Sequence, residues 1–269
     1  MNSLLRLART EWLKIRYYKP FWVLAALYPV SLLGVIVVAL WAQTEFQGLL
    51  PQGAVRAAKL PFSYPQVWHN VAYIGSWLHF IPALMIILNV TNEFTFRCHR
   101  QNPLDGWSRA LFLSAKLFWV VALASCCTGV VMLLSAAAGL VSGSAFSLTG
   151  FSYIGLFYLQ AIFYGVFVLF LAFWIRRATL TVAAYLIYSA ILENILSFLL
   201  NLKVQGLGGC LPLKVANALV PFSLLQDKAP AAAKGFLSNF SPSILVLATG
   251  FYLVLMLAAI GQRFRREDL

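Results

Sequence analysis

The sequence predicts an all-α membrane protein in which six transmembrane helices form one domain over residues 1–269. Hydrophobic residues make up 61% of the chain and charged residues 10%, with a mean hydropathy of +0.82. Because a soluble domain carries roughly 25% charged residues, this composition is typical of an integral membrane protein. Six stretches have the length of about 20 residues that a bilayer crossing needs. All six are expected to be helices, because hydrocarbon offers open backbone groups no hydrogen-bonding partner.

The basic charge of the chain indicates topology rather than nucleic-acid binding. Lys and Arg number 20 against 8 Asp and Glu, which gives a net charge of +12. These basic residues cluster at the ends of the apolar stretches, whereas a nucleic-acid-binding domain gathers them on a folded polar surface. We therefore expect the lipid bilayer, and not nucleic acid, as the surrounding partner.

An amphipathic helix is expected in the N-terminal segment 1–20. Leu5, Ala8, Trp12 and Ile15 recur at helical spacing, while basic residues fill the other faces. Such a helix lies in the headgroup plane of a membrane. An ordinary cytoplasmic leader is the alternative.

The six predicted spans are residues 21–42, 72–91, 117–140, 152–175, 179–200 and 243–262. The first is too long for a cleavable signal peptide, so we expect it to stay in the membrane. Pro29 and Pro82 are expected to kink the first and second spans, since proline cannot donate the helical hydrogen bond.

The distribution of basic residues predicts that both termini and the connection between spans 2 and 3 are cytoplasmic. With alternating spans, 14 Lys and Arg residues fall on the side that holds both termini and 6 fall on the opposite side. The cytoplasmic side is the one that carries the excess of Lys and Arg.

The connection between spans 2 and 3 is the most polar internal stretch. Its residues 92–110 read NEFTFRCHRQNPLDGWSRA and combine acidic, basic and aromatic side chains in one short link. We expect the charged groups to lie in water or against a partner, with the aromatic rings at the bilayer face. A short docking helix on which a soluble partner pushes is one interpretation, and a basic loop that only fixes topology is the other.

Two segments are expected on the external side. Within residues 201–242, GLGGC breaks the fifth helix, and the following LPLKVANALVPFSLL is apolar but too short to cross a bilayer. A re-entrant or interfacial segment is predicted there, since such an apolar run does not stay free in water. The other segment, 43–71, contains SYPQVWHNVAY and predicts a short surface helix that leads into span 2.

Motifs for catalysis or metal binding are missing from the sequence. It has no phosphate-binding loop and no HExxH, GxSxG or CxxC pattern. The three histidines and four cysteines have no metal-ligand or disulfide spacing. We therefore expect this chain to be no enzyme and to bind no metal or cofactor itself.

Glu193 is the one acidic residue inside a predicted span, so it is a candidate intramembrane polar site together with its neighbour Asn194. It lies about 14 residues, roughly 21 Å, from the cytoplasmic end of span 5. His79 lies about 7 residues deep in span 2 from the other side, at a depth that would let the two side chains pair. A polar group satisfied inside the bundle and a proton-coupled site are the two alternatives.

The layout of spans and connections resembles the permease subunits of ABC type-2 exporters. The shared features are six spans, cytoplasmic termini, an N-terminal surface helix, a polar connection after span 2 and an apolar external segment before span 6. The stretch TNEFTFRCHRQNPLDGWSRALFLSAK looks like the acidic, aromatic and arginine-containing sequence of that family, followed by Asp-Gly and an arginine at the start of the third helix.

This resemblance implies a dimeric permease, of identical or homologous copies, in a bacterial inner membrane. A separate pair of ATPase subunits would bind ATP and Mg²⁺, and the connection after span 2 would be the coupling helix that fits a groove on the ATPase. The segment 1–20 would be the connecting helix, and spans 2 and 5 would line the substrate path. By motif match, the residues that couple to the ATPase are Glu93, Phe94, Arg97, Arg100, Asp105, Gly106 and Arg109.

The function implied by this resemblance is ATP-driven export of a hydrophobic or amphipathic substrate, such as a lipid, peptide or drug. A six-span scaffold subunit of a secretion, motility or maturation complex is the alternative, and a proton-coupled carrier is a lesser one.

Overall fold

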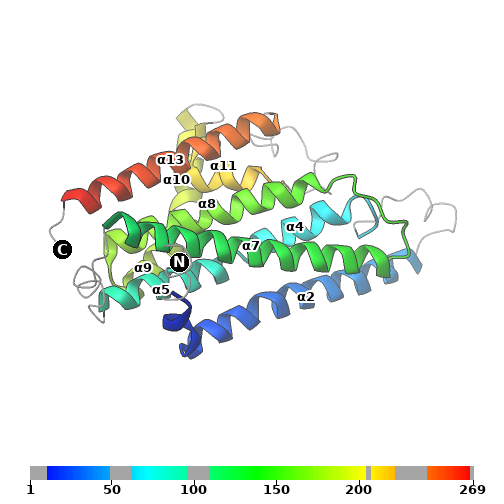
Figure 1. The fold of residues 1–269 in the computed structure, drawn as a ribbon. Coiled ribbons are helices and arrows are strands. Elements are labelled where there is room, and N and C mark those ends of the chain that lie inside the picture. Colours follow the sequence, from blue (N-terminus) through cyan, green and yellow to red (C-terminus); the bar gives the residue numbers. More distant parts are fainter. Residues whose placement is uncertain (1–10, 49–61, 96–108, 204–206, 222–240, 267–269) are drawn as a thin grey trace.

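The computed structural model describes residues 11–48, 62–95, 109–203, 207–221 and 241–266, and the regular elements in these ranges are all helices. After a helical turn at residues 11–16, they are α2 (Lys19–Gly48), α4 (Val67–Trp77), α5 (Phe80–Thr95), α7 (Arg109–Val141), α8 (Ser152–Ile175), α9 (Ala178–Ile187), the π-helix η2 (Tyr188–Leu192), α10 (Glu193–Lys203), the 3₁₀ helix η3 (Leu207–Cys210), α11 (Pro212–Ala218) and α13 (Pro242–Arg266). Figure 1 shows an elongated bundle, with α2 and α13 on opposite sides of α7 and α8.

Membrane-length segments account for most of the described chain. Among the described residues, five helical segments are long and apolar enough to cross a membrane, and α4 and α5 make a sixth when this bent pair is taken as one span. Each of the six predicted spans falls inside one of these segments. The predicted all-α class is thus confirmed, and the long apolar helices fit a membrane-embedded protein.

The bend in the second span has a chemical cause at Pro82. This proline is the third residue of α5, where it has no N–H to donate and its ring crowds the carbonyl of Leu78, four positions earlier. Leu78 and His79 form the break between α4 and α5, whose axes differ by 45°. The kink predicted at Pro82 is therefore present, whereas Pro29 lies inside the unbroken α2.

The central helix of the bundle is α8. In its most apolar stretch 67% of the residues are buried, against 17% in α2 and 11% in the segment Ala178–Lys203. It contacts α4, α5, α7, α9, α11 and α13. A helix that is apolar on all sides is typical of a core or membrane helix, and the outer helices expose their apolar side chains as lipid-facing helices do.

The ends of several helices meet at one end of the bundle. There Phe94 of α5 packs edge-to-face on Phe173 of α8 with ring centroids 5.8 Å apart, and the Arg176 guanidinium lies over the Phe94 ring. Arg263 of α13 lies over Trp174 at 4.4 Å from the ring centroid. The C-terminal end of α13 therefore lies beside the ends of α5 and α8, which is the grouping of chain ends that alternating spans predict.

Residues 67–71 differ from the sequence-based expectation of a surface helix. Val67, Trp68 and Val71 of α4 are at most 2% exposed, and α4 packs against α7 and α8. Burial is possible because the polar atoms of its aromatic residues find partners: the Trp68 indole N–H donates to the carbonyl of Ser147 at 2.8 Å. As a result, α4 forms the first half of the bent pair α4–α5 inside the bundle.

The apolar segment after α10 folds back against the bundle. Together, η3 and α11 contact α8, α10 and α13, and Leu213, Val215 and Ala216 of α11 are buried. This packing excludes a structureless loop for residues 207–221. Residues 222–240 of the predicted segment lie outside the described residues.

Candidate functional site

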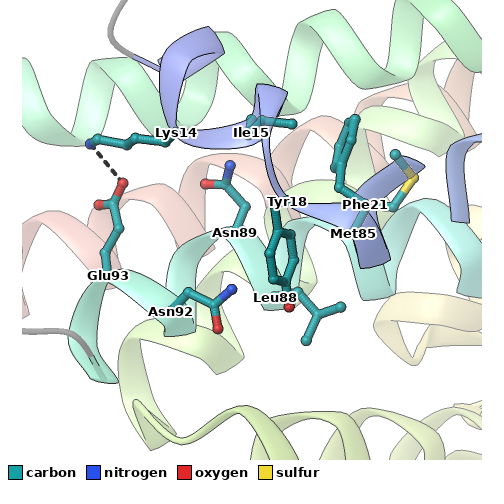
Figure 2. Close-up of a pocket in the computed structure, with 9 residues that line it drawn as sticks. All are labelled: Lys14, Ile15, Tyr18, Phe21, Met85, Leu88, Asn89, Asn92 and Glu93. Atoms are coloured by element: carbon teal, nitrogen blue, oxygen red, sulfur yellow. Dashed lines mark hydrogen bonds and ion pairs between the residues drawn. The ribbon is translucent and has the colours of Figure 1, made fainter. Parts of the chain in front are cut away.

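The N-terminal helical turn at residues 11–16 lies against helices that follow much later in the chain. Its residues Glu11 and Lys14 are three positions apart and therefore share one face of the turn. That face meets Glu93 near the end of α5 and Lys116 in the first part of α7. Figure 2 shows Lys14 reaching Glu93 from the N-terminal segment.

These four side chains form a closed ring of alternating charge, which we call the ionic ring. The Lys116 ammonium lies 2.7 Å from Glu93 Oε1 and 2.8 Å from Glu11 Oε2. Lys14 Nζ closes the ring at 2.7 Å from Glu93 Oε1 and 3.3 Å from Glu11 Oε1. Lys116 also donates to Asn89 Oδ1 at 3.0 Å, so each of its three N–H groups has an acceptor. The ring is neutral and joins three segments of the chain.

Burial makes the closure of the ionic ring energetically important. The side chains of Lys116 and Glu11 are at most 1% exposed and that of Glu93 is 6% exposed, whereas Lys14 is 34% exposed. Removing one partner of a buried ion pair typically costs about 3–5 kcal/mol, because the other charge stays buried without compensation. The ring therefore holds the N-terminal segment, α5 and α7 in one arrangement.

The charges of the ring keep one another ionised. Burial raises the pKa of Glu11, but the ammonium groups of Lys116 and Lys14 outweigh this effect and hold that pKa below its ordinary value. Burial lowers the pKa of Lys14, but the carboxylates of Glu93 and Glu11 outweigh it and raise that pKa above its ordinary value. Both groups are therefore charged at neutral pH.

A cavity of about 240 Å³ lies beside the ionic ring (Figure 2). Ile15, Tyr18 and Phe21 line it from the N-terminal segment and the start of α2, and α5 lines the other side. The amides of Asn89 and Asn92 add polar groups to a mostly apolar wall. Side chains thus leave space between the N-terminal segment and α5, and the ring is a polar link across that space.

The predicted coupling residues that the structure describes lie at the ends of the connection. Glu93 belongs to the ionic ring, Phe94 packs on Phe173, and Arg109 is the first residue of α7. Glu93 and Phe94 face the bundle and fix the start of the connection to it. The predicted residues Arg97, Arg100, Asp105 and Gly106 lie outside the described residues.

The predicted intramembrane candidates Glu193 and Asn194 hold α11 in place. Glu193 is 2% exposed, and its Oε1 accepts hydrogen bonds from the backbone N–H groups of Leu213 and Lys214 at 2.7 and 3.0 Å. These N–H groups lie in the first turn of α11, where no helical acceptor is available, so the carboxylate caps that helix. Asn194 Oδ1 accepts a 2.6 Å hydrogen bond from Lys214 Nζ. The π-helix η2 ends directly before Glu193, and π turns often occur at functional sites.

His79, the third intramembrane candidate, belongs to a neighbouring polar cluster. No hydrogen bond joins it to Glu193 in the described part of the chain. Its ring is 2% exposed and stacks on that of Tyr164, with centroids 5.0 Å apart. The Tyr164 hydroxyl donates to Asn217 Oδ1 of α11 at 2.9 Å, and Gln160 donates to the same oxygen at 3.0 Å. Glu193 and the Tyr164 cluster thus reach α11 through separate contacts.

Sequence reasoning did not single out Glu11 and Lys116 as site residues. Glu11 is the only acidic residue before Glu45 and lies within a basic run, and Lys116 is the only charged residue of α7 after Arg109. An acidic residue within a basic segment, such as Glu11, and a single lysine in an apolar helix, such as Lys116, both indicate that the side chain takes part in an ion pair. The sequence does not show that these two residues meet across 105 positions.

No protein-family model matches the sequence, and a search of curated proteins found no match. Among the described residues, no group of three or more His, Cys, Asp or Glu side chains is placed to hold a metal ion. A functional proposal therefore has to start from the geometry of the ionic ring and of the α10–α11 region.

Proposed function

We propose that this chain is the permease subunit of an ATP-driven exporter and that a separate ATPase drives it through the connection at residues 92–110. The observation that supports this proposal most strongly is the ionic ring at the ends of that connection. The ring joins the two helices that flank the connection, α5 and α7, to the N-terminal segment. A connection held in this way is suited to transmit a push.

The ring distributes such a push over several helices. Glu93 lies two residues before the end of α5 and bonds lysines on two other segments, so a displacement of Glu93 also displaces the N-terminal segment and α7. The packing of Phe94 on Phe173 extends the link to α8. Binding of nucleotide to a partner can then bias the bundle between two arrangements, provided that the partner contacts the two arrangements differently.

The charge at this end of the bundle supports a cytoplasmic position. Basic residues gather there, and cytoplasmic ends of spans carry the excess of Lys and Arg. The described ones are Lys14, Arg16, Lys19, Lys116, Arg176, Arg177 and Arg263. With this orientation both termini and the connection face the cytoplasm of a bacterial cell, where an ATPase has access to ATP and Mg²⁺.

The remaining parts of the proposal rest on the resemblance to ABC type-2 permeases. A second permease copy, identical or homologous, completes the path, and the cargo is a hydrophobic or amphipathic molecule. The fold-back of α11 between α8, α10 and α13 supports a re-entrant segment before the last span.

Copurification from native membranes tests the proposal. The affinity-tagged chain should recover an ATPase, identified by mass spectrometry, and vesicles containing both should transport cargo only with ATP. Replacing Arg97, Arg100 and Asp105 together by alanine should lower ATPase recovery at least tenfold without lowering the Tm. The matched control is Lys19→Ala with Arg177→Ala, two exposed basic residues near the same end, which should keep recovery.

Two results would overturn the proposal. One is full recovery of the ATPase and full ATP-driven transport by the triple variant, which would reduce the connection to a topology signal. The other is a purified chain that is active without any nucleotide-hydrolysing partner.

A further inference from the structure

We infer that the exposed face of α11, with Lys214 and Asn217, binds the anionic group of an amphipathic molecule at mid-depth of the membrane. This inference requires that the chain span a bilayer, but it does not require an ATPase partner.

Two helices independently place α11 near the middle of the bundle. Asn217 accepts hydrogen bonds from Gln160 and Tyr164, which lie about 8 and 12 residues from the start of α8, or roughly 12 and 18 Å along its axis. Glu193 lies about 10 residues, or roughly 15 Å, before the end of the segment Ala178–Lys203. The hydrocarbon core of a bilayer is about 30 Å thick, so both measures put α11 close to its centre.

The outward face of α11 is rich in hydrogen-bond donors. Lys214 and Asn217 are three positions apart and share that face, while Leu213 and Ala216 face the core. Lys214 gives one of its three N–H groups to Asn194 Oδ1. The Asn217 oxygen accepts both Gln160 and Tyr164, so its NH₂ group is left to donate on the exposed side.

The charge that this face presents is positive. Glu193 is 2% exposed and directs its Oε1 to the backbone of α11. Lys214 takes part in no salt bridge with a described residue and its hydrogen-bond partner Asn194 is uncharged, although the buried Glu193 carboxylate attracts its ammonium. A basic residue at the centre of a bilayer costs about 2.5–3.5 kcal/mol on insertion scales, and such residues commonly mark a substrate path. An anionic ligand group would compensate this charge.

The surroundings of the donor-rich face define the rest of the ligand. Phe198 lies one turn after Asn194 on α10 and is 64% exposed, and Phe251 of α13 is 65% exposed. The hydroxyl of Tyr252, next to Phe251, donates to the carbonyl of Cys210 in η3, which places this part of α13 beside the same region. A ligand with one carboxylate or phosphate and a hydrocarbon chain matches both the donors and the apolar surface.

Binding of defined amphiphiles to the full-length chain in a non-ionic detergent tests the inference. Oleate and phosphatidylglycerol carry a carboxylate and a phosphate, and oleyl alcohol and phosphatidylcholine are the matched compounds without net charge. We expect at least one anionic amphiphile to bind about tenfold or more tightly than its uncharged match, because charge-assisted hydrogen bonds are about twice as strong as neutral ones. Comparing oleate with phosphatidylglycerol tells which anionic group is preferred.

Variants identify the responsible residue. Lys214→Gln should abolish the preference for the anion and Lys214→Arg should keep it. Lys203→Gln removes an exposed lysine at the end of α10 and should leave the preference unchanged. Equal binding of charged and uncharged amphiphiles by the unmodified chain, or an unchanged preference in Lys214→Gln, would overturn the inference.

A measurement on the unmodified chain covers the case in which Lys214→Gln fails to fold. A photoreactive oleate should crosslink to peptides from residues 191–221, and an excess of unlabelled oleate should suppress this crosslink while oleyl alcohol does not. Crosslinks confined to other helices would overturn the inference.

Discussion

Lys116 Nζ lies 2.7 Å from Glu93 Oε1, although the two residues belong to different helices and stand on either side of the central connection. The same ammonium reaches Glu11, 105 positions earlier in the chain. A single buried lysine thus joins both ends of the connection to the N-terminal segment. A force applied to the connection would therefore reach Lys116, Glu93 and Glu11 together.

The ionic ring should be needed for stability. Lys116→Met removes the ammonium and leaves Glu11 and Glu93 buried with only Lys14 between them, so we expect a loss of about 3–5 kcal/mol. Thermal unfolding in detergent, followed by size-exclusion chromatography, measures this loss. Lys203→Met, at an exposed lysine of α10, should change stability by less than about 0.5 kcal/mol.

A double variant tests whether the ring acts as a unit. Adding Glu93→Gln to Lys116→Met removes a buried carboxylate that has lost its main partner. The double variant should therefore lose less stability than the two single losses summed, by about 0.5–3 kcal/mol. Additive losses would show that the two residues do not interact as the structure indicates.

The pH dependence of thermal stability should show the stabilising contribution of the ionised Glu11 carboxylate. Its folded-state pKa lies below the ordinary value of about 4.3, so its carboxylate stabilises the fold above that pH, and the contribution is lost as pH falls through the lower folded-state pKa. Glu11→Gln should lower the Tm at pH 7, and its difference from the unmodified chain should shrink below about pH 4. A difference that stays constant from pH 7 to pH 3 would contradict this assignment.

The stabilising contribution of the Lys14 ammonium should be lost at alkaline pH. Its folded-state pKa is raised, so its contribution is present below the ordinary lysine value of about 10.4 and is lost as pH rises through the higher folded-state pKa. Lys14→Gln should therefore differ from the unmodified chain at pH 7 and approach it in stability above about pH 10.5. Thermal unfolding across an alkaline pH series measures this convergence.

Glu193 should be required to hold α11. Glu193→Leu leaves two backbone N–H groups without an acceptor, which we expect to cost about 2–4 kcal/mol and to increase hydrogen exchange at Leu213 and Lys214. Glu193→Gln keeps a carbonyl oxygen in nearly the same place and should cost less than half as much. Equal losses in both variants would mean that the hydrogen bonds are not the reason for the effect.

Two glycines of α8 provide a matched test of packing. A Cβ at Gly165 would lie 2.5 Å from Val120 Cγ1 and 3.2 Å from Ile86 Cδ1, whereas a Cβ at Gly155 would meet no atom within 4 Å. Gly165→Ala should therefore cost about 1–3 kcal/mol through overpacking. Gly155→Ala should be neutral or stabilise by up to about 1 kcal/mol through helix propensity. The reverse order in thermal unfolding would place α8 differently from the structure.

The sequence predicted the spans well because their signal is local. Hydrophobic length alone placed a span at residues 152–175, and α8 has the same bounds. The burial of residues 67–71 was not predicted, since Trp68 is a residue type that also favours a membrane surface. The burial of Trp68 depends on α7, on α8 and on the carbonyl of Ser147, which no local pattern reveals.

The candidate site was predictable only in part. Polarity drew attention to Glu93 and Glu193, because charged groups beside or inside apolar runs are rare. Their partners could not be read from the sequence. Lys116 and the backbone of α11 come from distant segments, and only the packing of the bundle brings them together.

The ionic ring also bears on how the chain is assembled. Glu11 leaves the ribosome 105 residues before Lys116, and until then Lys14 is its only neighbour of the ring. The ionic ring can therefore close only after the first two spans have been inserted and the start of α7, which carries Lys116, has left the ribosome. An inverted second span would leave Glu93 and Lys116 across the bilayer from Glu11 and Lys14, so the ring can close only when the first spans have the orientation seen in the structure.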